Sequence, residues 1–216
     1  MLEKMSDFFE ARIDGYDEHM MTAIESADEF YPFTAKQLPT AENCRILDLG
    51  CGTGLELEWY FKINPTAELT CIDLSELMLS KLEEKFSEKK IIRIQGSYFD
   101  TPLGENEFDS AVSVESLHHF TKKEKVGLYA RLKKSLKDGG YFILTDYFSE
   151  SDEEERIHRQ SLLTLKAQQG ITDDDFYHYD TPLTVNHERE ALIEGGFSSV
   201  EVLNSWGATY TIKATK

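Results

Sequence analysis

Short apolar runs alternate with longer amphipathic stretches along the first two thirds of the chain. The apolar runs are rich in Ile, Leu, Val and aromatic residues and are bounded by turn residues, so they predict five β-strands, at residues 45–50, 68–74, 91–96, 108–115 and 141–148. Stretches of helical length separate these strands. Strands that alternate with helices predict a parallel sheet covered on both faces, with right-handed crossovers.

Residues of helix-capping type precede three of the helical stretches. Thr53, Ser75 and Thr121 each stand where a predicted helix begins. Gly139-Gly140 follows the third helical stretch and is predicted to end it. The pattern therefore predicts three connecting helices with defined ends.

Further helices are predicted outside this alternation. Residues 1–38 have a helical pattern with interruptions at Gly15 and Pro32, and 152–169 and 186–194 are also helical, joined by the stretch ITDDDFYHYDTPL. We find no internal repeat and no low-complexity linker.

The end of the chain breaks the parallel pattern. Residues 198–205 and 208–214 resemble strands, and only Trp206-Gly207 separates them. Such a short connection is typical of a hairpin and is too short for a crossover. One of these two strands must therefore run antiparallel to the rest of the sheet.

Charge and cysteine usage narrow the function classes. The net charge is −17, and residues 1–44 and 149–190 each contribute −7, so the surface repels phosphate backbones and nucleic acid is an unfavourable partner. A solvated acidic surface also explains the excess of negative charge.

No apolar run is long enough to cross a membrane, and the polar, acidic start lacks the pattern of a leader peptide, so a cytoplasmic protein is expected. The spacing of Cys44, Cys51 and Cys71 favours buried thiols over a disulfide or a zinc site.

A glycine-rich loop, GCGTG at 50–54, follows the first strand, at the sheet edge where open α/β sheets bind ligands. The third glycine is Gly54, one position early for the dinucleotide fingerprint, and a phosphate-binding P-loop would need a lysine that is absent. Asp73 ends the second strand 19 residues beyond Gly54. A carboxylate there accepts both hydroxyls of a ribose, which indicates an adenosine-type ligand without a 2′-phosphate.

Four motifs in order extend this pattern: LDLGCGTG, CIDLS, FDSAVSVESLHHF and LKDGGYFILTD. Together they resemble the class I S-adenosylmethionine-dependent methyltransferases over about residues 43–148 and the terminal strand pair. The resemblance implies a Rossmann-like three-layer α/β sandwich, with a seven-stranded, mostly parallel sheet and an antiparallel terminal hairpin strand. It also implies a helical cap over residues 1–42, a cofactor-binding domain over 43–216, and a helical lid insertion at about 150–190.

The resemblance further implies the cofactor, S-adenosylmethionine, with S-adenosylhomocysteine as product. Arg12 and Tyr16 match an entry helix that approaches the cofactor carboxylate, although packing of the helix face explains them nearly as well. Many family members have an acid after the third strand, and this chain has Ser97 there instead. The expected cofactor contacts are Arg12, Tyr16, Asp48, Gly50, Cys51, Gly52, Gly54, Asp73, Leu74, Met78, Ser97, Tyr98 and Val114.

Methyl transfer is an in-line displacement, so alignment is the main requirement, and a base is needed only when the acceptor must lose a proton. Candidate bases follow the fourth and fifth strands, with His118, His119 and Asp146 as the expected catalytic residues and Glu115 and Tyr147 beside them. Each histidine is also a candidate for orienting the loop. No metal site is expected, because Asp146 has no obvious companions in the sequence.

The two acidic segments suggest the acceptor. The resemblance places them over the substrate, and carboxylates with aromatic faces favour a cationic small molecule such as an amine. The alternatives are a non-catalytic S-adenosylmethionine-binding regulator and another S-adenosylmethionine-using transferase on the same fold. The sequence leaves the oligomeric state open, although Phe8, Phe9 and Tyr31 are candidates for a homodimer contact or for the core.

Overall fold

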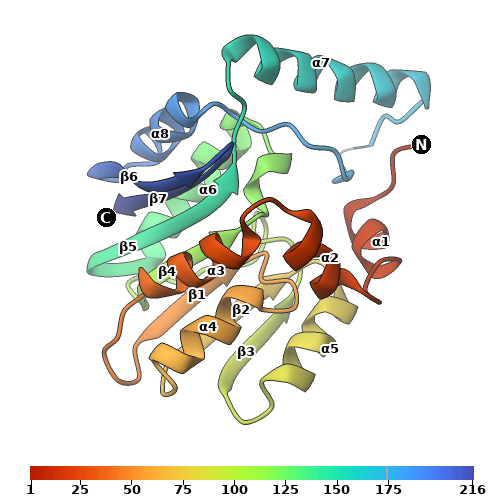
Figure 1. Ribbon diagram of the computed structural model, residues 1–216. Helices are drawn as coiled ribbons and strands as arrows, with labels where there is room; N and C mark the ends of the chain where they lie inside the picture. Colours follow the sequence, from red (N-terminus) through yellow and green to blue (C-terminus); the bar gives the residue numbers. More distant parts are fainter. Residues whose placement is uncertain (174) are drawn as a thin grey trace.

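One seven-stranded sheet organises the chain (Figure 1). The computed structural model describes residues 1–173 and 175–216, and Asp174 of the acidic stretch lies outside the described residues. The strand order is β3-β2-β1-β4-β5-β7-β6. The strands are β1 Arg45–Leu49, β2 Glu68–Asp73, β3 Lys90–Gln95, β4 Phe108–Val114, β5 Leu136–Tyr147, β6 Ser199–Trp206 and β7 Thr209–Thr215.

The first five strands are parallel, and β7 runs antiparallel to both β5 and β6. The predicted hairpin and the Rossmann-like class are therefore confirmed, and β7 is the reversed strand. The helices are α1 Met5–Glu10, α2 Tyr16–Ala23, α3 Ala27–Lys36, α4 Leu55–Ile63, α5 Glu76–Lys85, α6 Lys122–Ser135, α7 Asp152–Gln168 and α8 Val185–Glu194, with a 3-10 turn at Leu117–His119.

Helices cover both faces of the sheet (Figure 1). On one face, α3, α4 and α5 bury side chains such as Phe30, Tyr60 and Leu82 against the sheet. On the other face, α6 and α8 do so with side chains such as Leu132 and Leu192. Burial of this apolar surface supplies the main driving force for the fold. Among the described residues, no helix combines the length and the apolar composition that a membrane crossing requires.

Two of the predicted helix caps are confirmed. The Ser75 hydroxyl accepts a hydrogen bond from the N–H of Met78 at 3.2 Å, and Thr121 forms a capping box with Glu124. These contacts satisfy backbone donors that the first turn of a helix leaves free.

Two predicted helix ends are wrong. Gly54, at φ +76°, is the residue that precedes α4, and the Thr53 hydroxyl instead donates to Asp17 at 2.5 Å. Gly139 and Gly140 do not close α6, which ends at Ser135; they lie in β5, at a register shift against β4. The segment between α6 and the paired part of β5 is thus extended rather than helical.

The N-terminal segment and the stretch between α7 and α8 pair with each other. The N–H of Met5 donates to the carbonyl of Phe176 at 2.9 Å, and the N–H of His178 donates to the carbonyl of Glu3 at 3.0 Å. The Phe8 ring stacks on His178 with a centroid distance of 3.4 Å. We call the pairing of residues 3–5 with 176–178 the latch; the two acidic segments, 1–44 and 149–190, meet there. Tyr31, by contrast, is buried in the core.

Candidate active site

The glycine loop after β1 adopts backbone conformations that side chains disfavour. Gly50, Gly52 and Gly54 all have positive φ, at +72°, +51° and +76°. A Cβ on Gly50 would lie 2.0 Å from the Ser116 hydroxyl oxygen, so no side chain fits there. The loop therefore brings bare backbone to the ends of β1 and β4.

Asp73 at the end of β2 fastens this loop. Its Oδ2 accepts a hydrogen bond from the N–H of Gly52 at 2.8 Å, and its Oδ1 accepts one from the N–H of Ser75 at 2.9 Å. Burial raises the pKa of Asp73, and these backbone donors partly offset the rise. The carboxylate thus stands beside the loop with acceptor capacity left on each oxygen.

A cavity opens above the loop at the carboxyl edge of β1, β2 and β4, and we call it the cofactor cavity. Nine of the thirteen predicted cofactor contacts line it: Tyr16, Gly50, Cys51, Gly52, Asp73, Leu74, Met78, Tyr98 and Val114. Eight further residues line the cavity and were not among the predicted cofactor contacts: Met5, Phe9, Tyr31, Leu55, Glu56, Glu115, Ser116 and His119. Met5, Phe9 and Tyr31 reach the cavity through tertiary packing, which no local spacing indicates.

The remaining four predicted contacts lie elsewhere. Gly54 packs under α5, where a Cβ would approach Phe86 to 2.9 Å. Ser97 accepts a hydrogen bond from the N–H of Phe99 at 3.1 Å and shapes the turn after β3. Arg12 pairs with Glu3 at 3.2 Å and faces a second cavity. Asp48 lies inside β1, beneath the loop.

Asp48 and Glu56 form a buried pair of acids under the cofactor cavity. Both are at least 97% buried, and neither oxygen of Asp48 has a hydrogen-bond partner among the described residues. Burial and the neighbouring Glu56 raise the pKa of Asp48 well above its usual value, and burial also raises the pKa of Glu56. Both carboxyl groups therefore keep their protons to higher pH in the folded protein than in the unfolded chain.

Replacing Glu56 with glutamine is expected to stabilise the cofactor-free protein at pH 8 by about 1 kcal/mol. A raised pKa in the folded state means that stability falls as pH rises from the unfolded pKa through the folded one. The neutral amide removes that loss, so the gain should shrink towards pH 4. Urea unfolding at both pH values measures it, and exposed Glu42→Gln is the matched control. A gain that is equal at both pH values would contradict this account.

A second cavity adjoins the first, and we call it the acceptor cavity. Four residues line both cavities, namely Phe9, Tyr16, Glu115 and His119. The acceptor cavity extends from this shared border between α1, α2 and the latch, and its further polar residues include Arg12, Asp14, His19, Glu25, His118, Tyr147, His178 and Asp180. Molecules bound in the two cavities would therefore both contact these four side chains.

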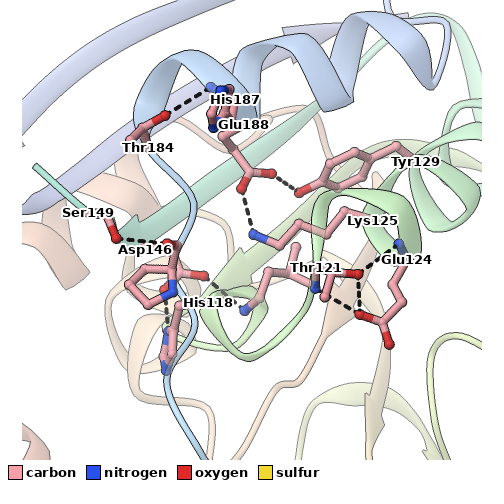
Figure 2. Close-up of polar contacts among 12 residues, drawn as sticks. His118, Thr121, Glu124, Lys125, Tyr129, Asp146, Ser149, Thr184, His187 and Glu188 are labelled. Atoms are coloured by element: carbon pink, nitrogen blue, oxygen red, sulfur yellow. Dashed lines mark hydrogen bonds and ion pairs between the residues drawn. The ribbon is translucent and has the colours of Figure 1, made fainter. Parts of the chain in front are cut away.

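Asp146 at the end of β5 anchors the loop that carries the two histidines. Its carboxylate accepts a hydrogen bond from the N–H of Leu117 at 2.8 Å and lies 2.6 Å from His118 Nδ1 (Figure 2). Burial opposes the charged ring, but Asp146 outweighs this and raises the pKa of His118. Asp146 therefore orients both the loop and the imidazole.

His119 has a different environment. Its Nδ1 lies 3.1 Å from Asp180 Oδ1. Burial, with the neighbouring charge of His118, lowers the pKa of His119 to about 4, so this ring is neutral at pH 7. The pKa values of the adjacent histidines are therefore shifted in opposite directions.

Asp146 has companions that the sequence did not reveal. Ligand-type atoms of Glu115, His118 and Asp146 lie within 4.8 Å of one another, and so do those of His118, His119 and Asp180. The expectation that Asp146 stands alone is wrong. That no metal binds stays a prediction, and elemental analysis of the purified protein tests it.

Comparison with known proteins agrees with this geometry. Residues 47–144 match the family model described as a methyltransferase domain. The chain is 32% identical over 142 residues to an uncharacterised protein of a Synechococcus strain, covering 64% of this chain and 34% of that protein. It is 26% identical over 146 residues to an uncharacterised methyltransferase of a Geobacillus strain, covering 68% and 65%. The chain thus spans from about a third to two thirds of the length of these relatives.

Solved structures share the fold. Human N-acetylserotonin methyltransferase, solved in complex with S-adenosylmethionine, superposes with a TM-score of 0.63 at 18% identity, covering 88% of this chain and 52% of that one. An S-adenosylmethionine-dependent methyltransferase of Mesorhizobium loti gives a TM-score of 0.62 at 20% identity, covering 86% and 96%. The glycine loop, the strand order with a reversed β7 and the matched residues lead to one conclusion: residues 47–144 belong to a methyltransferase domain, on the fold that the solved S-adenosylmethionine-dependent methyltransferases share.

Proposed function

We propose that the protein transfers the methyl group of S-adenosylmethionine to a small molecule that carries an amine. The observation that carries this proposal is the shared border of the two cavities, formed by Phe9, Tyr16, Glu115 and His119. Methyl transfer needs donor sulfur, methyl carbon and acceptor atom in one line, and good alignment is worth roughly 7–11 kcal/mol of barrier. Two adjoining cavities with a common wall provide such an arrangement.

The lining of the acceptor cavity supports a cationic acceptor. It contains the carboxylates of Asp14, Glu25, Glu115 and Asp180, against one guanidinium, that of Arg12. Aromatic faces also line it, and such faces bind ammonium groups: Phe8, Phe9, Tyr16, Tyr147 and Trp206. Within the predicted lid insertion at about 150–190, the aromatic and acidic run 177–180 contributes His178 and Asp180 to the cavity lining, whereas Tyr177 and Tyr179 do not line it.

Within this proposal, the predicted catalytic residues position the acceptor. His118 and His119 line the acceptor cavity, and Asp146 fixes the ring of His118 from behind. The imidazole rings of His118 and His119, both from the 3-10 turn Leu117–His119, therefore offer hydrogen-bonding groups to the acceptor. The reducing cytoplasm is the proposed location, which three buried free cysteines support.

An acceptor screen tests the proposal. Purified protein is incubated with S-adenosylmethionine and matched panels of small amines, phenols and carboxylic acids, and S-adenosylhomocysteine is measured. We expect turnover with members of the amine panel. Turnover confined to phenols or acids would contradict an amine acceptor. Tight cofactor binding with no turnover in any panel would favour the alternative of a non-catalytic regulator.

A further inference from the structure

Glu115 has an unusual backbone conformation at the border of the two cavities. It directly follows β4, and its φ is +49°, a region that residues other than glycine, asparagine and aspartate rarely adopt. Its N–H donates to the carbonyl of Thr145 at 2.9 Å, which holds the strained residue against β5. Strain of this kind persists where the surrounding structure fixes it, and it is concentrated at functional sites.

The carboxyl group of Glu115 has an oxygen without a partner. Its Oε1 is buried, and no hydrogen-bond donor of the described residues reaches it. Of the neighbouring acids, Asp146 is paired, because its Oδ1 lies 2.6 Å from His118 Nδ1. Asp180 Oδ1 lies 3.1 Å from His119 Nδ1 but, like Glu115 Oε1, has no hydrogen-bond partner among the described residues. A buried acceptor that lacks a donor is unfavourable, so the missing donor belongs to a molecule in one of the two cavities.

We propose that Glu115 binds the reacting nitrogen of the acceptor and removes its proton before methyl transfer. This inference rests on the proposed methyltransferase function and names the residue that selects an amine. Glu115 lines both cavities, as the group that receives this proton must. It is therefore assigned as a catalytic residue, whereas Asp146 is a positioning residue.

The chemistry balances without a further reactant. The Glu115 carboxylate takes one proton from the acceptor ammonium, which leaves a neutral amine with a free electron pair. That pair forms the new carbon–nitrogen bond as the sulfur–methyl bond breaks, and the electrons of the broken bond remain on sulfur. The products are the methylated ammonium and S-adenosylhomocysteine, and the proton on Glu115 then leaves to solvent.

The surroundings of Glu115 favour an amine over other acceptors. A carboxylate substrate would place its negative charge beside Glu115, Asp146 and Asp180, which like-charge repulsion disfavours. An ammonium group supplies both the missing hydrogen-bond donor and a compensating charge. Burial, reinforced by Asp146, raises the pKa of Glu115 to about 8, which brings it closer to the pKa of an amine.

Sinefungin tests this inference without knowledge of the acceptor. In this analogue of S-adenosylmethionine, a carbon bearing a protonated amine replaces the sulfonium sulfur and its methyl group, so a nitrogen with donors stands near the point of transfer. We would titrate sinefungin, S-adenosylhomocysteine and S-adenosylmethionine calorimetrically into wild type, Glu115→Gln and the matched control Glu42→Gln. Glu42 is exposed and precedes β1, at the opposite edge of the sheet.

We expect Glu115→Gln to weaken sinefungin about tenfold relative to S-adenosylhomocysteine, because a charge-assisted hydrogen bond is lost. Glu42→Gln should leave all three affinities unchanged. An unchanged ratio of sinefungin to S-adenosylhomocysteine in Glu115→Gln would overturn the inference. An equal loss for S-adenosylmethionine would also overturn it, since Glu115 would then recognise the sulfonium charge.

Failure of the underlying function gives a different result. If wild type binds none of the three ligands, the methyltransferase proposal itself is wrong. Retained binding of S-adenosylhomocysteine shows that the variant is folded. If Glu115→Gln no longer binds S-adenosylhomocysteine, Glu115→Asn is titrated in its place, because asparagine adopts positive φ more readily. The same changes in affinity are expected for Glu115→Asn.

Discussion

Alanine at position 73 is expected to weaken binding of S-adenosylhomocysteine at least about a hundredfold. The two ribose hydroxyls would lose a partly buried carboxylate acceptor, and hydrogen bonds to a charged group contribute about 1.5–3 kcal/mol each. The loss also reaches the glycine loop, because Asp73 accepts the N–H of Gly52 at 2.8 Å. Titration calorimetry of wild type and Asp73→Ala measures the effect, with NAD as a ligand that should bind neither protein.

Asp73→Asn separates the two causes. Its amide oxygen accepts one of the two backbone hydrogen bonds that now reach Asp73, from Gly52 and Ser75. The affinities of adenosine and of S-adenosylhomocysteine are measured for both variants. If the carboxylate acts mainly on the ribose, the two ligands should lose affinity by the same factor in Asp73→Ala, and again by the same factor in Asp73→Asn. Near-wild-type binding of S-adenosylhomocysteine by Asp73→Ala would refute the assigned role of this residue.

The second large effect concerns stability, at a buried ion pair between α6 and α8. Lys125 of α6 and Glu188 of α8 are 1% and 0% exposed, and their side chains lie 2.5 Å apart (Figure 2). Tyr129 donates its hydroxyl proton to the same carboxylate. Replacing Glu188 with alanine leaves a buried ammonium unpaired, and we expect a loss of about 3–5 kcal/mol in the free energy of unfolding. Urea unfolding of the cofactor-free protein measures it.

The matched double variant makes the cause testable. In Lys125→Met combined with Glu188→Leu no charge remains to be buried, and such replacements are often neutral or stabilising. We expect this variant to recover most of the stability that Glu188→Ala loses. Equal destabilisation of the single and double variants would instead indicate that packing between α6 and α8, rather than the unpaired charge, determines the result.

Local sequence pattern predicted the frame of the fold because the frame depends on local signals. The apolar runs of β1 to β4, the cap of α5 at Ser75 and the short connection before β7 are each decided within a few residues. The errors have the same origin. Thr53 has the chemistry of a cap, but the positive φ of Gly54 starts α4, and the threonine bonds to distant Asp17 instead.

The candidate site was predictable only in part. Residues on the glycine loop and the strand ends followed from motif position, and most of them line the cofactor cavity. Phe9 and Tyr31 reach it through packing of the N-terminal helices, which no spacing encodes. Glu115 was recognisable as an acid near the acceptor, but its missing hydrogen-bond partner depends on which neighbours pair with one another in three dimensions.

The latch has a consequence for the order in which the protein is built. Lys4 of the latch pairs with Tyr177 and also contacts Asp175, 171 residues later in the chain, so the N-terminal helices leave the ribosome long before their partner exists. Strands β1 to β5 are complete by Tyr147, well before that partner is made. During synthesis the nascent chain can therefore form an open, cofactor-ready sheet edge, and the acceptor cavity acquires its walls among the last steps of folding.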